Sequence, residues 1–155
     1  MIYADTSFIS SCYVRDVHTD SASVWLKKHQ PRLPFLFLHW PEIAKAIAAH
    51  AANPEIIYNT LRAEVAAGVK FHVPEIEVNR VGQRAAGLLW NWFPQWKKLR
   101  SLDAMHVAAA VETGAKTFLS FDSKSYQRVL ATTQKMTVWP PLTDEEKLWL
   151  EQSST

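Results

Sequence analysis

Cysteine is scarce in this sequence, which holds only Cys12 among its 155 residues. A single cysteine excludes an internal disulfide framework and any cysteine-based metal cluster, and it favours a reducing, cytoplasmic setting. The opening residues, MIYADTSFIS, show no basic region followed by a long apolar stretch, so we expect no signal peptide. No apolar run approaches the roughly 20 residues that a membrane span needs. We therefore expect a soluble cytoplasmic protein without a membrane partner.

A strong net charge is missing as well. The 17 Lys and Arg residues exceed the 15 Asp and Glu residues by a formal net charge of +2, a mild bias towards an anionic partner. Glycine is rare, with 4 residues, whereas tryptophan is frequent, with 7. Tryptophan at this frequency serves a core, an interface or base stacking, and composition does not choose among these roles.

The residues that are present are those of an ordinary globular protein. Hydrophobic residues make up 48% and charged residues 21%, which excludes a disordered chain. The length suffices to bury a core, so we predict a single domain over residues 1–155, with a short helix and tail over residues 143–155.

Short apolar runs alternate with helix-like segments along the chain. The predicted strands cover residues 1–4, 33–38, 69–73, 116–121 and 136–139. The predicted helices cover residues 20–29, 42–52, 54–67, 77–92, 102–113 and 123–131, followed by a terminal helix with capping-box spacing from Thr143 to Glu146. Ser101 and Asp122 are the predicted N-caps of the helices that follow them, and Gly68 is a predicted helix stop. This alternation is typical of an α/β protein with a mainly parallel sheet covered by helices.

Four carboxylates lie where a parallel sheet places its sites. Asp5 and Asp122 directly follow predicted strands, while Glu42 and Asp103 lie in the first turns of predicted helices. Because the carboxyl ends of parallel strands share one edge of the sheet, we expect these acids to converge. Taken singly, each acid is more simply explained by the 0.3–1 kcal/mol or so that a carboxylate gains at a helix start.

Gathered in one cleft, four carboxylates would repel one another and require a cation or a shared proton. Oxygen ligands of this kind suit Mg²⁺ or Mn²⁺. Such a cation positions a water, lowers its pKa and screens the charge of a phosphodiester transition state, while a carboxylate outside the coordination shell accepts the proton. The histidines lack the H-E-x-x-H spacing of zinc hydrolases. The pattern therefore predicts metal-dependent hydrolysis of a phosphodiester.

The order and setting of these acids resemble the PIN domain, most closely the VapC-type toxins of bacterial and archaeal toxin–antitoxin pairs. The resemblance rests on IYADTSFI, WPEIAKAIA, LDAMHVAAAVETGA and TFLSFD, and it runs from residue 1 to about residue 138. It implies a three-layer α/β/α sandwich and an Mg²⁺- or Mn²⁺-dependent endoribonuclease. Asp5, Glu42, Asp103 and Asp122 match the family's catalytic acids, and Asp5, Asp103 and Asp122 would hold the metal. The resemblance also implies an RNA substrate, a homodimer and a small antitoxin whose tail enters the acidic groove.

Two serines match hydroxyl positions of the same family. Ser7 lies two residues after Asp5, and Ser120 lies two residues before Asp122. Ser7 either orients a metal-bound water or a phosphate, or caps the first helical turn. Many relatives carry a further acid shortly after the last one, where this chain has SKS at residues 123–125. We therefore expect only one firmly held metal ion.

Basic residues beside the acids and beside a tryptophan-rich segment are candidates for RNA contact. These residues are Arg84, Lys97, Lys98, Arg100, Lys124 and Arg128. For Lys124 and Arg128, an exposed helix charge is the default interpretation. The segment LLWNWFPQWKKLR combines three tryptophans with three basic residues, as base-stacking surfaces do, but its spacing also fits a buried helical stripe. Packing in the core or a dimer is the favoured interpretation there, as packing is for His106.

Two other functions stay open. A non-catalytic module of the same fold would bind RNA or a protein through the groove, which agrees with the missing further acid. Phosphoryl transfer through an aspartyl nucleophile, as in haloacid-dehalogenase-like phosphatases, needs a second Asp where this chain has Ser7. The sequence does not identify the RNA, because selectivity comes from groove shape and surface contacts rather than from the phosphodiester.

Overall fold

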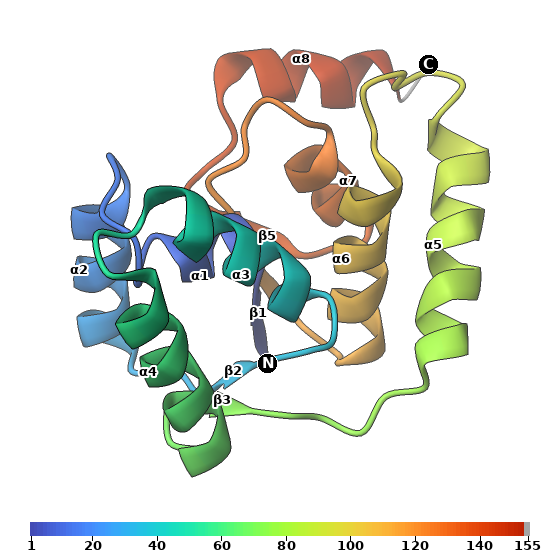
Figure 1. The fold of residues 1–155 in the computed structure, drawn as a ribbon. Coiled ribbons are helices and arrows are strands. Elements are labelled where there is room, and N and C mark those ends of the chain that lie inside the picture. The colour runs from blue at the N-terminus through green and yellow to red at the C-terminus, as the bar shows by residue number, and fades with distance from the viewer. Residues whose placement is uncertain (154–155) are drawn as a thin grey trace. The chain divides into compact units, whose positions relative to one another are not determined.

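Helices and short strands alternate along residues 1–153, which are the residues that the computed structural model describes. The chain divides into two compact units, one of residues 2–74 and one of residue 1 together with residues 75–155. Figure 1 shows the elements of both units. The single domain predicted over residues 1–155 stays a prediction, and the end of its tail, residues 154–155, lies outside the described residues.

The unit of residues 2–74 holds a parallel pair of short strands. Its elements are β1 (Ile2–Ala4), α1 (Thr6–Ser10), α2 (Thr19–His29), β2 (Leu33–Pro34), α3 (His39–His50), α4 (Pro54–Ala67) and β3 (Phe71–His72). Strands β2 and β3 pair in parallel, with Leu33 opposite Phe71. Helix α4 has the predicted bounds, because Pro54 suits the first helical position and Gly68 ends the helix in the left-handed conformation, at φ 68°.

The apolar run over residues 33–38 is a strand for only two residues, so its predicted extent is wrong. Pro34 has no N–H for a continued ladder, and Phe35 makes one last backbone bond to His72 before the chain turns. Helix α3 then begins at His39, three residues before the predicted start, because a proline is tolerated within the first helical turn. The apolar side chains Phe35, Leu36 and Leu38 are nevertheless buried.

The unit of residue 1 and residues 75–155 also holds a parallel strand pair. Its elements are α5 (Val78–Trp92), α6 (Ser101–Glu112), β4 (Thr117–Leu119), α7 (Gln127–Thr133), β5 (Thr137–Trp139) and α8 (Asp144–Gln152). Strands β4 and β5 pair in parallel, with Phe118 opposite Val138. Helix α6 is buried on all sides, with Ala108, Ala109 and Ala110 in succession, and α5 packs along it (Figure 1).

Two predicted helix starts in this unit are wrong, and one is confirmed. Arg100, not Ser101, is the N-cap of α6. Asp122 does not cap the next helix, because α7 begins only at Gln127. The capping box between Thr143 and Glu146 is confirmed, since Thr143 N donates to Glu146 Oε2 over 2.8 Å. Among the described residues, no helix has the length and apolar character required to cross a membrane.

Candidate functional site

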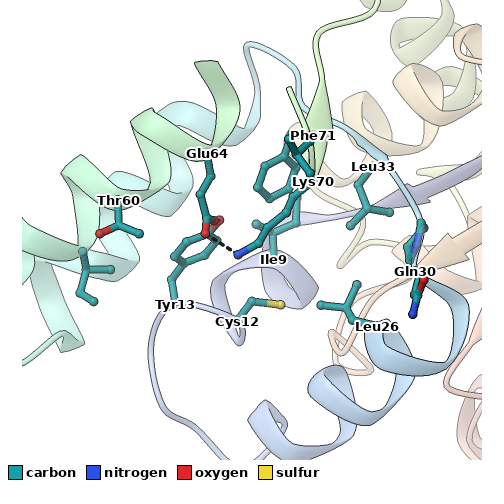
Figure 2. A pocket seen from close by; sticks show the side chains of 13 residues that line it. Ile9, Cys12, Tyr13, Leu26, Gln30, Leu33, Thr60, Glu64, Lys70 and Phe71 are labelled. Atoms are coloured by element: carbon teal, nitrogen blue, oxygen red, sulfur yellow. Dashed lines mark hydrogen bonds and ion pairs between the residues drawn. The ribbon is translucent and has the colours of Figure 1, made fainter. Parts of the chain in front are cut away.

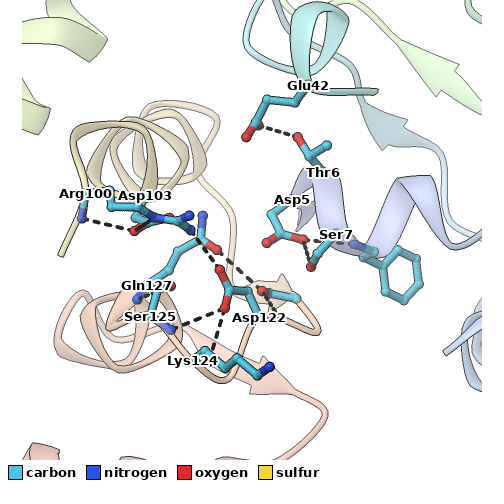
Figure 3. A network of polar contacts seen from close by, with 12 residues as sticks. Asp5, Thr6, Ser7, Glu42, Arg100, Asp103, Asp122, Lys124, Ser125 and Gln127 are labelled. Atoms are coloured by element: carbon cyan, nitrogen blue, oxygen red, sulfur yellow. Dashed lines mark hydrogen bonds and ion pairs between the residues drawn. The ribbon is translucent and has the colours of Figure 1, made fainter. Parts of the chain in front are cut away.

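Asp5 is the N-cap of α1, directly after β1, in the unit of residues 2–74 (Figure 3). Its Oδ1 accepts hydrogen bonds from Phe8 N at 3.0 Å and from Ser7 Oγ at 2.7 Å. Asp5 as a whole residue is 3% exposed. Ser7 thus supports the cap of the first turn indirectly, because it fixes the carboxylate that caps it. The contact agrees with a role in capping and also with a role in orienting a metal-bound water or a phosphate, because the hydroxyl is hydrogen-bonded to the candidate metal ligand.

Glu42 lies in the first turn of α3, as predicted, within the same unit. Its Oε2 accepts a hydrogen bond from Thr6 Oγ1 at 2.6 Å, which joins α1 to α3 (Figure 3). The start of α3 is fixed further by His39, whose Nδ1 accepts from Leu36 N at 2.9 Å and whose Nε2 donates to Ala4 O at 3.0 Å. His39 therefore ties the helix of Glu42 to the end of the strand that precedes Asp5.

Asp5 and Glu42 also act together on a neighbouring side chain. The pKa of Tyr3 lies well above its ordinary value, first because the phenol is buried and then because Asp5 and Glu42 repel a phenolate. The ring of Tyr3 lies 5.5 Å from the ring of His39, centroid to centroid. This half of the candidate site thus concentrates negative charge over a buried, neutral tyrosine.

Asp103 occupies the first turn of α6 in the unit of residues 75–155, and Arg100 holds it (Figure 3). Arg100 Nε donates to Asp103 Oδ2 and Arg100 Nη2 to Asp103 Oδ1, each over 2.9 Å. The backbone N of Arg100 also donates to Oδ2, at 3.1 Å. The contact is a bidentate, charge-assisted pair, the strongest geometry that a guanidinium and a carboxylate form.

Asp122 lies in the loop between β4 and α7 of the same unit. Its Oδ1 accepts hydrogen bonds from Lys124 N at 3.1 Å and from Ser125 N at 3.2 Å, so the carboxylate closes a turn instead of capping a helix. Its own backbone N donates to Ser120 Oγ at 3.1 Å. Ser120 is fully buried, and its place suits holding this loop in shape.

One cation joins the two aspartates of this unit. Arg100 Nη2 lies 2.9 Å from Asp103 Oδ1 and 2.9 Å from Asp122 Oδ2 (Figure 3). The Arg100 side chain is 66% exposed, whereas the two carboxylates are 6% and 25% exposed. The two acids therefore converge on a position for positive charge that is open to solvent. The Arg100 guanidinium neutralises both carboxylates.

The convergence of all four acids stays a prediction. The residues brought together are Asp5 with Glu42 in one unit, and Asp103 with Asp122 in the other. Within residues 1–153, no group of three or more His, Cys, Asp or Glu side chains is arranged to hold a metal ion. Each unit by itself thus supplies two carboxylates, and a complete ligand set is not contained in either.

The other predicted contact residues have varied surroundings. Arg84 pairs with Glu112, with 2.5 Å between Nε and Oε1. Lys97 Nζ lies 5.0 Å from the centre of the Phe93 ring. Lys98 and Lys124 are exposed, while His106 is buried in α6, as the favoured packing interpretation predicts.

Arg128 is buried, so its interpretation as an exposed helix charge or a phosphate contact is wrong. Its Nε lies 3.0 Å from Glu146 Oε1, and both side chains are almost inaccessible, at 4% and 0% exposure. Its guanidinium also donates to the carbonyl oxygens of Ser120, at 3.2 Å, and Pro140, at 2.8 Å. Arg128 therefore connects helix α8 to the loop that carries Asp122.

The unit of residues 2–74 also holds a largely apolar cavity of about 490 Å³ (Figure 2). Its polar wall is formed by Tyr13 and Lys70, both of which donate to the carboxylate of Glu64. Cys12, which is exposed, lines the cavity too, and its Sγ donates to Phe8 O at 3.5 Å.

The parallel strand pairs and the interleaved helices define an α/β protein, in which acids follow β1 and β4. No family model matches the sequence, and no curated protein matches it. Among solved structures, the chain is similar to Mycobacterium tuberculosis VapC20, described as a sarcin–ricin loop cleaving toxin. The TM-score is 0.64 at 14% sequence identity, over 80% of this chain and 92% of that chain. This likeness confirms the predicted PIN-like α/β/α fold.

Proposed function

We propose that this chain is a metal-dependent endoribonuclease that hydrolyses RNA phosphodiester bonds as the toxin of a toxin–antitoxin pair. The observation that carries the proposal is the pair Asp103 and Asp122, whose carboxylates share one cationic group at 2.9 Å each. Two aspartates around one positive charge are a donor set for Mg²⁺ or Mn²⁺. The likeness to VapC20 supports the assignment, because that protein is described as a toxin that cleaves the sarcin–ricin loop.

In the proposed site, Asp5, Asp103 and Asp122 would hold Mg²⁺ or Mn²⁺, which would supply charge neutralisation and an activated water. Ser7 fixes the orientation of Asp5 through its hydrogen bond to Oδ1. Glu42, held in place by Thr6, accepts the proton of the attacking water. The substrate contacts would come from Ser7, Arg84, Arg100 and Lys124. The predicted contact from Ser120 is not proposed, because this side chain is fully buried and holds the loop of Asp122.

Arg100 has two roles in this proposal. Without a metal ion its guanidinium neutralises Asp103 and Asp122 and so holds both in place. If Asp103 and Asp122 bound a divalent ion, the exposed guanidinium would turn to an RNA phosphate, a ligand that suits its planar donors. The same residue would thus preserve the geometry of the empty site and contribute to substrate binding in the metal-bound one.

The proposal includes the partners that accompany such a toxin: a second copy of the chain and a small antitoxin with an acidic tail, in the cytoplasm. These partners rest on the resemblance of the sequence to VapC-type toxins. A short reading frame that overlaps or directly precedes this gene would encode the antitoxin.

A non-catalytic RNA- or protein-binding module is the second candidate. It is favoured by the contact of Arg100 with both aspartates, which satisfies their charge without a metal ion. In that case the groove would bind its partner and leave it intact.

Cleavage assays on the purified chain separate the two candidates. The substrates are ribosomal RNA that includes the sarcin–ricin loop, transfer RNA and messenger RNA, each with Mg²⁺, Mn²⁺ or EDTA. We expect cleavage that requires a metal ion and that falls at least about 100-fold in Asp103→Asn, because one ligand charge is lost. Sequencing of RNA ends then locates the cut. Equal cleavage by the wild type, Asp5→Asn and Asp103→Asn, with contaminating nuclease excluded, would refute the proposal.

A further inference from the structure

The tryptophan-rich segment forms one end of a column of aromatic rings in the unit of residues 75–155. Trp92 and Trp96 stack with 4.4 Å between ring centroids and 11° between planes, and Trp96 and Tyr126 stack at 5.3 Å and 5°. Trp149 of α8 continues the column at 4.4 Å from Tyr126, with its ring tilted by 50°. Trp96 is buried in the middle of the column, which confirms core packing for that residue. Trp92, at the end, is only half-buried.

Trp92 also lines a polar pocket of about 490 Å³ between α5, the end of α6 and the end of α7. One stripe of α5 supplies most of the wall, including Arg80, Gln83, Arg84 and Asn91. Residues three, four and seven apart face the same side of a helix, so these groups project into one space. The pocket thus combines an aromatic surface, amides and positive charge.

The positive charge of the pocket is only partly neutralised. Arg80 Nε lies 3.0 Å from Glu112 Oε2, and Arg84 Nε lies 2.5 Å from Glu112 Oε1. Two guanidinium groups share one carboxylate, which leaves a net charge of about +1 within a few ångströms. Both arginines contact Glu112 through Nε, and each guanidinium also carries two terminal Nη groups. Those groups are the donors that bind phosphate oxygens in a bidentate manner.

We propose that this pocket is a nucleotide subsite for single-stranded RNA, a role that rests on the proposed ribonuclease function. An unpaired base stacks on Trp92, the amides of Gln83 and Asn91 meet its edge, and Arg80 and Arg84 contact the adjoining phosphate. Aromatic rings beside phosphate-binding cations are the common means of holding unpaired bases. An acidic peptide would use the two arginines but would leave the aromatic wall and the amides without a role.

A glycine in the wall of the pocket makes a clean test possible. Gly87 lies on the same stripe of α5, and a Cβ added there meets no atom within 4 Å. Gly87→Met therefore fills the pocket without displacing a neighbour. Gly82 lies on the same helix, also with no atom within 4 Å of an added Cβ, but it does not line the pocket. Gly82→Met is thus the matched control, and both changes favour the helix.

The experiment measures binding of a fluorescently labelled single-stranded RNA of about eight nucleotides, a length typical of single-strand sites. Anisotropy is recorded in EDTA, so cleavage does not contribute. We expect the Kd to rise about tenfold in Gly87→Met and in Trp92→Leu, because loss of one stacked base has an effect of this order. Gly82→Met should bind like the wild type, and an RNA duplex of equal length should bind more weakly than the single strand.

Equal Kd values for the wild type and Gly87→Met would overturn the subsite, as would an equal loss in Gly82→Met. The same holds if the wild type binds poly-glutamate but no RNA, which would assign the pocket to an acidic protein segment. The readout is independent of catalysis. If the chain cleaves no RNA but binds RNA more weakly in Gly87→Met, the subsite is supported and the proposed activity is refuted. If the chain is a metal-dependent nuclease whose RNA binding is unchanged in Gly87→Met, the activity is supported and the subsite is refuted.

Discussion

At the scale of single residues, Arg100 shows how much the role of a side chain depends on its neighbours. The sequence identified it as a candidate RNA contact, because it is basic and lies beside a tryptophan-rich segment. The structure places it on Asp103 and Asp122, as N-cap of α6 and as their common cation. Nothing in the residue pattern distinguishes an arginine that binds phosphate from one that holds two carboxylates.

Arg100→Gln should bind Mn²⁺ more tightly than the wild type, by about three- to tenfold. The guanidinium competes with the ion for Asp103 and Asp122, and removing it removes an exposed ion pair worth up to about 1 kcal/mol per contact. Isothermal titration calorimetry measures the affinity. Arg80→Gln, which removes an arginine that contacts Glu112 in the same unit, is the control and should leave the affinity unchanged. An unchanged or weaker affinity in Arg100→Gln would show that the guanidinium does not occupy the ion's position.

The stability of the chain should fall as the pH rises above about 10, and Tyr3 should account for part of the loss. Burial, and then repulsion by Asp5 and Glu42, raise the pKa of the folded Tyr3 phenol well above its ordinary value. Above that ordinary value the unfolded chain has lost the proton that the folded chain keeps, so a rise in pH favours unfolding. The urea midpoint of the wild type should therefore decrease from about pH 9 to about pH 11 by more than that of Tyr3→Phe. Identical decreases would contradict a phenol that its surroundings keep neutral.

At the scale of elements, the termini of helices were predictable where one residue type determines them. Pro54 and Gly68 bound α4, and Thr143 with Glu146 opens α8, because each acts through its own backbone or its own side chain. The strand over residues 33–38 and the N-cap at Ser101 were wrong for the opposite reason. An apolar run is buried equally well as a strand or as a turn. The N-cap of α6 is fixed by the Asp103 carboxylate, which accepts from the backbone N of Arg100 at 3.1 Å.

The buried ion pair between α7 and α8 was not predictable either. Arg128 lies on a short helix with an unremarkable pattern, and Glu146 was assigned only to a capping box. The structure shows that Glu146 serves both the cap, through Oε2, and the pair with Arg128, through Oε1. Only the packing of α7 against α8 shows that Arg128 and Glu146 are buried.

Glu146→Gln should lower the free energy of unfolding by about 3 kcal/mol, because it leaves the Arg128 guanidinium buried without a counter-charge. Urea denaturation followed by circular dichroism measures the loss. Lys147→Ala, which removes the exposed pair with Asp144 on the same helix, is the matched control and should leave stability essentially unchanged. Equal effects of the two changes would mean that burial adds nothing to the Arg128–Glu146 pair.

At the scale of the whole molecule, the PIN-like fold was predictable, because the order of apolar and helical segments and the four acidic motifs together carry it. The composition of the site was predictable in part. The sequence identified the four acids, but it did not reveal Thr6 and His39, which hold the first two, or Arg100, which holds the last two. Those residues act through contacts between segments distant in sequence, which local patterns do not report.

Whether acids of both units serve one metal ion can be measured through stability. A ligand that binds only the folded chain stabilises it by about 2.7 kcal/mol at 100 times its Kd. We expect saturating Mn²⁺ to raise the Tm of the wild type by several degrees, and we expect Asp5→Asn and Asp103→Asn each to abolish the increase. A shift that persists in Asp5→Asn and disappears in Asp103→Asn would confine the metal to residues 75–155.

The stacked indoles of Trp92 and Trp96 carry an optical consequence. Two identical chromophores 4.4 Å apart and nearly parallel share their excited states, so the pair has a spectrum that neither ring has alone. A molecule laid against the outer ring perturbs both partners, and the signal passes to a ring that no ligand touches. The chain therefore contains its own spectroscopic probe at the end of α5, which would report occupancy by unlabelled RNA in near-ultraviolet circular dichroism.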